Sequence, residues 1–353
     1  MPPETLPPAP ATSATLVGMN NADPAQTTAT AHAAPDFDAV LTAASRIAPH
    51  INPTPVLHAR TLDAMAGCRL LFKCENLQRA GSFKFRGACN AVFSLTDAQA
   101  AHGVVTHSSG NHGGAVALAC RERGIPATVV VPRGASRVKL AAMESYGARI
   151  VPCEPTQASR DEVTARVLEE TGAVLVHPFN DPRVIAGQGT ATLEMLRFAP
   201  DIDTVVVPVS GGGLISGTAL AALGVDPSIQ VYGAEPAGAR DAHDSLKQGE
   251  RVTGRVADTV CDGLRAELGT LTYPLVRQLV RDILLVEDTQ TIDAMLLVWE
   301  RMKLVIEPSA AIGLAAVLAN PELFAGRTVG IVLSGGNIDL YQLSDLLSLA
   351  SRS

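Results

Sequence analysis

The sequence predicts an α/β protein in which two open, parallel-type sheets are flanked by helices. Strand-like and helix-like segments alternate from residue 37 onward, which is typical of parallel sheets with helices on both faces. Apolar runs at 204–209 and 328–333 have the length and continuity of strands buried on both faces. The 353 residues are 47% hydrophobic and 18% charged, which allows one large or two modest domains with a substantial core.

The individual elements follow from local periodicity. Phe37, Val40, Leu41, Ala44 and Ile47 recur at three- and four-residue intervals, as on one face of a helix. Further helices are expected at 81–94, 111–123, 136–146, 161–171, 212–223, 291–303 and 308–318. Strands are expected at 69–74, 104–106, 127–131, 173–176, 204–209, 230–234 and 328–333. No uninterrupted apolar run approaches the ~18 residues of a membrane helix, so no membrane partner is expected.

The first 35 residues differ from the rest of the chain. They are rich in Pro, Ala and Thr and have no hydrophobic period, which predicts a disordered tail at 1–35. The first Lys or Arg is Arg46, so neither a secretory signal nor a mitochondrial transit peptide is expected.

Charge and cysteine usage exclude several classes of function. The net charge of −7, the lack of a basic stripe and an aromatic content of 4% argue against nucleic acid as a partner. The six cysteines are scattered and none forms a CxxC pair, which excludes zinc-ribbon and thioredoxin-like sites. We therefore expect the cysteines to be small core residues, and the protein to lie in the reducing cytoplasm.

Four polar loops interrupt this apolar framework, at 81–87, 108–113, 210–214 and 334–337. In open α/β sheets, ligands bind beyond the carboxyl ends of strands, where such loops lie. The sequence therefore predicts that the four loops contribute to one binding site.

The loop Ser210–Leu214 predicts a phosphate site. Consecutive glycines at 211, 212 and 213 let backbone N–H groups converge on one anion, and the helix that follows adds its positive N-terminal end. The alternative is a tight strand–helix turn that simply requires glycine.

Lys84 is the candidate nucleophile. It lies between Phe83 and Phe85 at the start of a predicted helix, where desolvation would lower the pKa of its amine. The alternative is an ordinary solvated lysine. A reactive amine together with a phosphate cradle suggests a phosphorylated aldehyde held as a Schiff base, which is pyridoxal phosphate.

The whole pattern resembles the β-family, or fold type II, of pyridoxal-phosphate enzymes, whose fold is like that of tryptophan synthase β. Within it, the sequence is similar to the serine/threonine dehydratase and serine racemase group from about residue 37 to 345. The stretches that carry this resemblance are 75–78 (ENLQ), 81–84 (GSFK), 108–113 (SSGNHG), 177–179 (HPF), 185–190 (IAGQGT), 210–214 (SGGGL) and 334–337 (SGGN). The resemblance implies a large cofactor-binding domain at 36–100 with 179–350, and a small domain at 101–178.

The resemblance also implies roles for single residues. Lys84 would hold the cofactor as an imine and then remove the Cα proton of the substrate. Phe83 would pack beside the pyridine ring, and Asn111 would donate to its O3′ and contact the substrate. The phosphate would be bound by the N–H groups of Gly211, Gly212, Gly213 and Leu214.

Ser334 would meet the pyridine nitrogen. A hydroxyl stabilises a pyridinium far less than a carboxylate does, so the ring is a weaker electron sink. This favours prompt expulsion of a β-leaving group over transamination.

Four further residues are predicted near the substrate. Ser108 matches a donor for its carboxylate, and Ser109 matches the serine that works opposite the lysine in racemases. Ser109 could instead be a helix N-cap, and His112 a packed loop residue rather than a substrate contact. Arg160, with Arg265 near it, could hold a second substrate carboxylate, or both could be surface arginines.

A metal site is implied as well. Glu235, the carbonyl of Ala239 and Asp241 match the spacing of a divalent-cation site in many family members. Such hard oxygen ligands suit Mg²⁺, with Ca²⁺ or Mn²⁺ as alternatives. The alternative is a solvated acidic loop after a strand.

The resemblance implies a pyridoxal-phosphate-dependent dehydratase, an ammonia-lyase that converts a β-hydroxy amino acid such as L-threonine or L-serine to a 2-oxo acid and ammonia. The alternatives are a serine racemase with side elimination and a 3-hydroxyaspartate dehydratase. A cofactor-binding protein without catalysis is a fourth hypothesis. A homodimer that acts on a small-molecule amino acid is expected.

Overall fold

The larger sheet has six strands in the order β1-β2-β10-β7-β8-β9 in a computed structural model, which describes residues 33–135 and 137–351. Its strands are β1 (Val56–His58), β2 (Arg69–Cys74), β7 (Thr204–Pro208), β8 (Gln230–Pro236), β9 (Asp282–Val286) and β10 (Thr328–Leu333). All neighbours are parallel except β1 and β2, which pair antiparallel at the edge. Most of the predicted tail 1–35 lies outside the described residues.

The smaller sheet has four parallel strands in the order β5-β4-β3-β6. They are β3 (Val104–His107), β4 (Ala127–Pro132), β5 (Arg149–Cys153) and β6 (Val174–Leu175). β3 and β4 are almost entirely buried valine-rich runs, as expected for strands covered on both faces.

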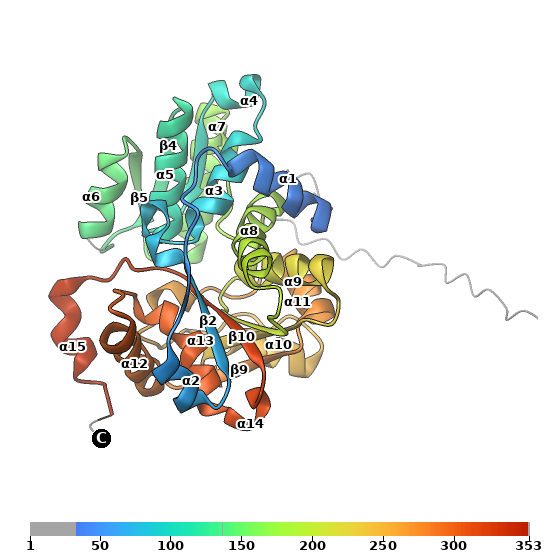
Figure 1. Cartoon of the computed structure of the whole chain (residues 1–353). Coiled ribbons are helices and arrows are strands. Elements are labelled where there is room, and N and C mark those ends of the chain that lie inside the picture. Colours follow the sequence, from blue (N-terminus) through green and yellow to red (C-terminus); the bar gives the residue numbers. More distant parts are fainter. Residues whose placement is uncertain (1–32, 136, 352–353) are drawn as a thin grey trace, which may run out of the picture. The chain divides into compact units, whose positions relative to one another are not determined.

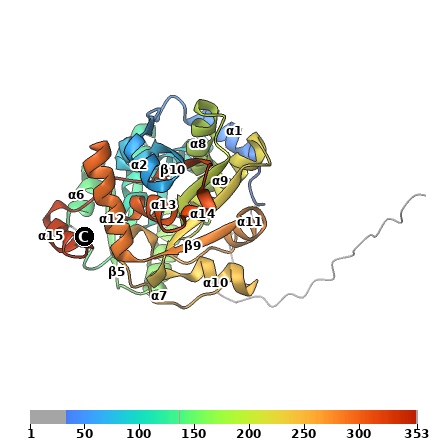
Figure 2. The same cartoon turned by 60° about the horizontal axis from the view of Figure 1, so that its bottom comes forward.

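Helices cover both faces of each sheet (Figures 1 and 2). Those that enter the argument below are α1 (Phe37–Ile47), α3 (Lys84–Phe93), α5 (Asn111–Arg123), α6 (Arg137–Ser145), α7 (Gln157–Thr171), α8 (Pro182–Phe198), α9 (Gly213–Val225), α10 (Asp241–Gln248) and α13 (Pro308–Ala319). The remaining helices are α2 (Arg60–Ala66), α4 (Asp97–Ala101), α11 (Thr272–Leu279), α12 (Asp288–Leu297), α14 (Pro321–Phe324) and α15 (Leu343–Leu347). Among the described residues, no helix is long and apolar enough to cross a membrane.

Helices α3, α8 and α9 pack backbone against backbone. A Cβ atom at Gly187 would lie 2.6 Å from the Cα of Gly87, and one at Gly189 would lie 2.6 Å from the carbonyl oxygen of Gly217. Only glycine permits this approach. The packing matters for function because α3 begins with Lys84 and α9 follows the glycine loop.

A buried ionic network joins α3 to β2 and α8. Arg86 is fully buried, and its guanidinium contacts Glu75 at 2.7 Å and Glu194 at 2.7 Å. Lys73 also contacts Glu194, at 2.7 Å. Burial opposes the charge of Arg86, but the two carboxylates outweigh it and raise the pKa of the guanidinium.

The predicted α/β class is confirmed, and the helices at 37–47 and 111–123 and the strands at 69–74 and 328–333 are observed with the predicted bounds. Ten of the described strands and α-helices were not predicted: β1, β5 and β9, and α2, α4, α8, α10, α11, α14 and α15. The predicted helix at 291–303 is divided into α12 and a π-helical turn at Val298–Met302. The predicted domain boundaries remain a prediction.

Candidate active site

Lys84 is the first residue of α3, and its side chain is partly buried. Its Nζ donates to the carbonyl of Pro178 at 3.1 Å and lies 5.1 Å from the centre of the Phe83 ring. Burial lowers the pKa of the Lys84 amine to about 8, against the opposing influence of Glu307. The amine is therefore closer to its neutral, nucleophilic form than an exposed lysine would be.

The glycine loop after β7 lies next to the segment that holds Lys84. A Cβ atom at Gly211 would overlap the Phe179 ring at 2.3 Å, and one at Gly213 would lie 3.0 Å from the Cβ of Phe179. Phe179 directly follows Pro178, whose carbonyl accepts from Lys84. The segment 178–179 therefore contacts both the lysine amine and the glycine loop. Gly212 has a φ of +88° and is the N-cap of α9 without a side-chain cap. The first N–H groups of α9 are therefore available to an anion.

Loop 334–337, which follows β10, forms hydrogen bonds with the loop 81–83 that precedes Lys84. The N–H of Phe83 donates to the carbonyl of Ser334 at 3.0 Å, and the N–H of Gly336 donates to the carbonyl of Gly81 at 2.9 Å. Ser334 is only 4% exposed and follows the last residue of β10. Ser334, the predicted partner of the ring nitrogen, therefore lies beside the segment that leads to Lys84, the predicted nucleophile.

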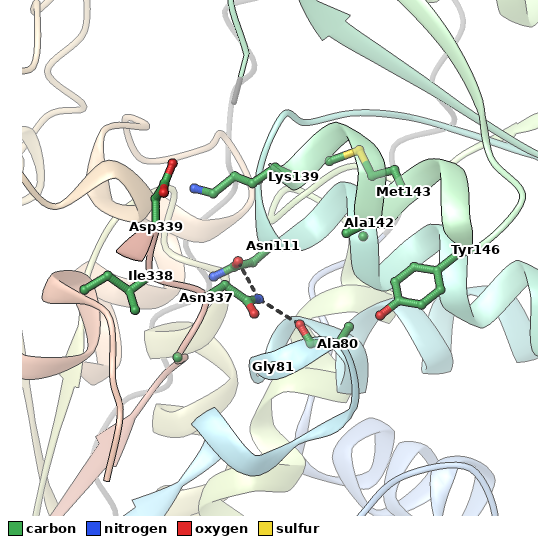
Figure 3. A pocket seen from close by; sticks show the side chains of 13 residues that line it. Ala80, Gly81, Asn111, Lys139, Ala142, Met143, Tyr146, Asn337, Ile338 and Asp339 are labelled. Atoms are coloured by element: carbon green, nitrogen blue, oxygen red, sulfur yellow. Dashed lines mark hydrogen bonds between the residues drawn. The ribbon is translucent and has the colours of Figure 1, made fainter. Parts of the chain in front are cut away.

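Asn111 lies within a chain of side-chain amides (Figure 3). Its Oδ1 accepts from Nδ2 of Asn337 at 2.9 Å, and its Nδ2 donates to Glu307 Oε1 at 2.8 Å. Asn337 also donates to the carbonyl of Ala80 at 2.8 Å. Ala80 has a φ of +56°, a conformation that is strained for a residue with a side chain and that tends to occur at functional sites.

Residues of three of the four polar loops, at 81, 110–111 and 336–337, border a cavity of about 350 Å³ (Figure 3). Its lining also includes Gly114, Lys139 and Tyr146, but neither Lys84 nor a residue of the glycine loop 211–213. A Cβ atom at Gly114 would meet no heavy atom within 4 Å, so this glycine leaves open space.

Ser108 and Ser109 lie in the loop before α5, where Ser109 was predicted to be either a catalytic serine or the N-cap of the helix. The N-cap of α5 is Gly110, and no side chain caps the helix. Ser109 is therefore not the helix cap, whereas Ser108 accepts a hydrogen bond from the N–H of Gly110 at 3.3 Å. His112 is 2% exposed, and its Nε2 bonds to the carbonyl of Val176 at 3.3 Å, so it is chiefly a packed residue of α5.

Sequence reasoning assigned no role to two further histidines. His107 and His177 pack edge to face with their ring centres 4.9 Å apart. Nδ1 of His177 accepts from the N–H groups of Phe179 and Asn180, at 3.3 and 2.9 Å. Burial is the main cause that lowers the pKa of His177 to about 3, so the ring stays neutral and acts as an acceptor. It thereby shapes the loop that contacts both Lys84 and the glycines.

The two predicted arginines have different partners. Arg160 lies in the first turns of α7 and donates to Gln157 at 3.1 Å. Helix α7 packs against β3, which ends at His107. Burial, followed by the charge of Arg160, lowers the pKa of His107 to about 4. Arg265 instead donates to the carbonyl of Thr259 at 2.6 Å.

Glu307 belongs to the site but was missed by sequence reasoning. It directly precedes α13, is 3% exposed and bonds to Asn111. A Cβ atom at Gly335 would lie 2.5 Å from its Oε1, so this glycine makes room for the carboxyl group. An isolated glutamate before a proline carries no spacing signal, so only the fold reveals it.

The predicted metal ligands lie at the end of β8 and in the segment that follows it. Glu235 is the second-last residue of β8, Ala239 lies in the turn Ala237–Ala239, and Asp241 is the first residue of α10. Glu235 accepts from the N–H groups of Ala242 and His243, both at 2.8 Å. Among the described residues, no group of three or more His, Cys, Asp or Glu converges as a metal cluster.

The two carboxyl groups nevertheless fit a cation. Glu235 and Asp241 are 1% and 5% exposed, and neither forms a salt bridge within the described part of the chain. Burial raises the pKa of Glu235 to about 8 and that of Asp241 to about 6. Such uncompensated acidic groups are what a hard divalent ion would neutralise.

A desolvated lysine, a glycine loop at an uncapped helix N-terminus and two hydrogen-bonded amides, at the carboxyl ends of parallel strands, indicate a cofactor-dependent α/β enzyme. Residues 47–335 match the model of the family "Pyridoxal-phosphate dependent enzyme", and the chain belongs to this family. The resemblance found in the sequence is thereby confirmed.

Three proteins similar to this chain indicate its place within the pyridoxal-phosphate-dependent family. A serine racemase from Arabidopsis thaliana is 52% identical, over 88% of this chain and 96% of its own. A beta-hydroxyaspartate dehydratase from Paracoccus denitrificans is 47% identical, over 88% and 98%. The structure of the processed form of threonine deaminase isoform 2 from Solanum lycopersicum is 30% identical and covers 90% of each chain, with a TM-score of 0.83.

Proposed function

We propose that this enzyme is a pyridoxal-phosphate-dependent dehydratase, a carbon–nitrogen lyase that converts L-threonine or L-serine to a 2-oxo acid and ammonia. The observation that carries the proposal is the partly desolvated amine of Lys84, joined through Pro178 and Phe179 to the glycine loop. Relatives that are named dehydratase or deaminase support it. The bound cofactor supplies an aldehyde and an electron-withdrawing ring that stabilises negative charge at Cα.

The residues of this chain would perform the remaining steps. The N–H groups of Gly211, Gly212, Gly213 and Leu214 would bind the phosphate, and Phe83 would pack against the ring. Ser108 would orient the substrate carboxylate. Lys84 would take the Cα proton, after which the β-hydroxyl leaves and the released enamine hydrolyses to the 2-oxo acid and ammonia. Ser334, a neutral hydroxyl, would keep the ring a weak electron sink, which favours elimination.

Racemisation is the second candidate function, because Ser109 does not cap helix α5. Its hydroxyl could return a proton to the Cα face opposite Lys84. The serine racemase from Arabidopsis thaliana supports this alternative. Both outcomes start from the same loss of a Cα proton, so one enzyme can have both activities.

A dicarboxylate substrate is the third candidate. Arg160, on helix α7 that packs against β3, could bind a second carboxylate, and the Paracoccus denitrificans relative is named for beta-hydroxyaspartate. A panel of L- and D-serine, L-threonine, phenylserine and the 3-hydroxyaspartate diastereomers, followed for ammonia release and chirality, tests all three. The dehydratase proposal fails if serine and threonine release no ammonia.

Replacing Ser109 by alanine should suppress racemisation of serine at least tenfold more than ammonia release from L-serine, because only racemisation needs a proton donor opposite Lys84. Chiral analysis of serine and an ammonia assay measure the two rates in one reaction. Ser108→Ala is the matched control, and it should raise KM for both reactions alike. Equal losses in Ser109→Ala would show that the serine is structural.

Chelation should lower the melting temperature, and Mg²⁺ should restore it, because a cation bound only to the folded state stabilises that state. The proposed ligands are Glu235, the carbonyl of Ala239 and Asp241. Glu235→Gln should remove the response to Mg²⁺, whereas the exposed control Glu322→Gln should retain it. A melting temperature that does not respond to chelator or Mg²⁺ in the unaltered enzyme would eliminate this metal site.

We also propose a cytoplasmic homodimer. All six cysteines are buried and free, which suits a reducing compartment. Sedimentation of the purified enzyme would establish its oligomeric state.

A further inference from the structure

Glu307 is a buried acid that none of the roles above uses. Its Oε1 accepts one hydrogen bond, from Asn111, and its Oε2 is buried without any partner in the described part of the chain. It takes part in no salt bridge there, and although it is the N-cap residue of α13, its side chain makes no capping hydrogen bond. A buried carboxylate with one neutral donor is costly, so the second oxygen either carries a proton or meets a ligand group.

The amide chain determines which way Asn111 faces (Figure 3). Nδ2 of Asn337 donates to both the carbonyl of Ala80 and Oδ1 of Asn111. Asn111 must then turn its Nδ2 toward Glu307, which uses one of the two N–H bonds of that amide. The second N–H bond is left for a ligand in the pocket.

We propose that Glu307 is a positioning residue that acts through Asn111: it holds the Asn111 amide toward the cofactor and, by gaining or losing a proton, sets the charge next to Lys84. This inference rests on the proposed cofactor site, but on none of the proposed substrates. The proton that Glu307 loses goes to solvent, a proton gained by the nitrogen of Lys84 comes from solvent, and no bond between heavier atoms changes.

Titratable and charged groups from several elements face this carboxyl. Lys84 of α3 senses its charge, as does the thiol of Cys261, and Lys139 of α6 forms an ion pair with Asp262 nearby. Burial first and Asp262 second raise the pKa of Glu307 to about 7, while Lys139 and the Asn111 hydrogen bond lower it. Cys261 stays a neutral thiol because burial raises its pKa.

The direction of the effect follows from these signs. Below about pH 7 the Glu307 carboxyl is neutral, and above it the group becomes an anion, whose charge raises the pKa of Lys84. An anion raises the proton affinity of a nearby nitrogen. As the pH rises through this range, Glu307 should therefore favour a protonated nitrogen at Lys84, which changes the visible absorbance of the bound cofactor.

The test is a pH titration of the visible spectrum of the holoenzyme without substrate. The unaltered enzyme and the exposed control Glu322→Gln should show a transition with a midpoint near pH 7. Glu307→Gln retains an oxygen acceptor for Asn111 but cannot ionise, so this transition should disappear while the cofactor stays bound. An unchanged transition in Glu307→Gln would overturn the proposal.

A second pair of variants leaves Glu307 intact. Asp262→Asn removes an anion and should move the midpoint to lower pH, while Lys139→Gln removes a cation and should move it to higher pH, each by about half a unit or more. Midpoints that stay in place in both variants would refute the proposal even if Glu307→Gln did not fold. Because the readout needs no substrate, a negative substrate panel would leave this test valid, and a failed titration would leave the proposed reaction untouched.

Discussion

Lys84→Ala should abolish the visible absorbance of the bound cofactor and reduce turnover by roughly 10³-fold or more, because the covalent link and the Cα base are lost together. Within the described structure the amine of Lys84 donates to a main-chain carbonyl, and an alanine leaves no amine at this position. Spectra of the purified variant and its rate of 2-oxo acid formation are the measurements.

Lys247→Ala is the matched control for this loss. Lys247 is an exposed residue of α10 that pairs with Asp282 at 3.3 Å, so both the absorbance and the rate should stay unchanged. If Lys84→Ala kept its colour and its activity, the cofactor would be attached elsewhere and the proposed function would fail.

Arg86→Met should destabilise the folded enzyme by about 3–5 kcal/mol, the usual cost of removing one partner of a buried ion pair. Glu75 is fully buried and would be left without the guanidinium that contacts it at 2.7 Å. Glu194 would suffer less, because it is about a third exposed and keeps Lys73. Urea unfolding of the purified variant measures the change.

Two comparisons make this prediction specific. Arg166→Met breaks an exposed pair with Glu170 on α7 and should cost less than about 1 kcal/mol. Combining Arg86→Met with Glu75→Gln removes the stranded charge, so the double variant should lose less stability than the sum of the two single variants. Strict additivity would show that the charges do not interact as the structure indicates.

Local patterns predicted the class of fold and the polar loops, but they failed for a helix that carries glycines and for short edge strands. Helix α8 packs against α1, α3 and α9, and most of its residues are buried. Its paired glycines read as breaks in a helix, although they allow close packing against Gly87 and Gly217. Strand β1 has only three residues and pairs at an edge, which leaves almost no pattern to detect.

By itself, the sequence determined the α/β class, the four inner strands of the larger sheet, the glycines that expose the backbone at 211–213 and the lysine that begins α3. These depend on contacts between near neighbours, which a local pattern records. Only the tertiary structure decided that Gly110 rather than Ser109 caps α5, that Arg160 and Arg265 have separate partners, and that Glu307 meets Asn111. Asn111 and Glu307 are 196 positions apart in the chain, and such long-range contacts arise only when the whole core packs.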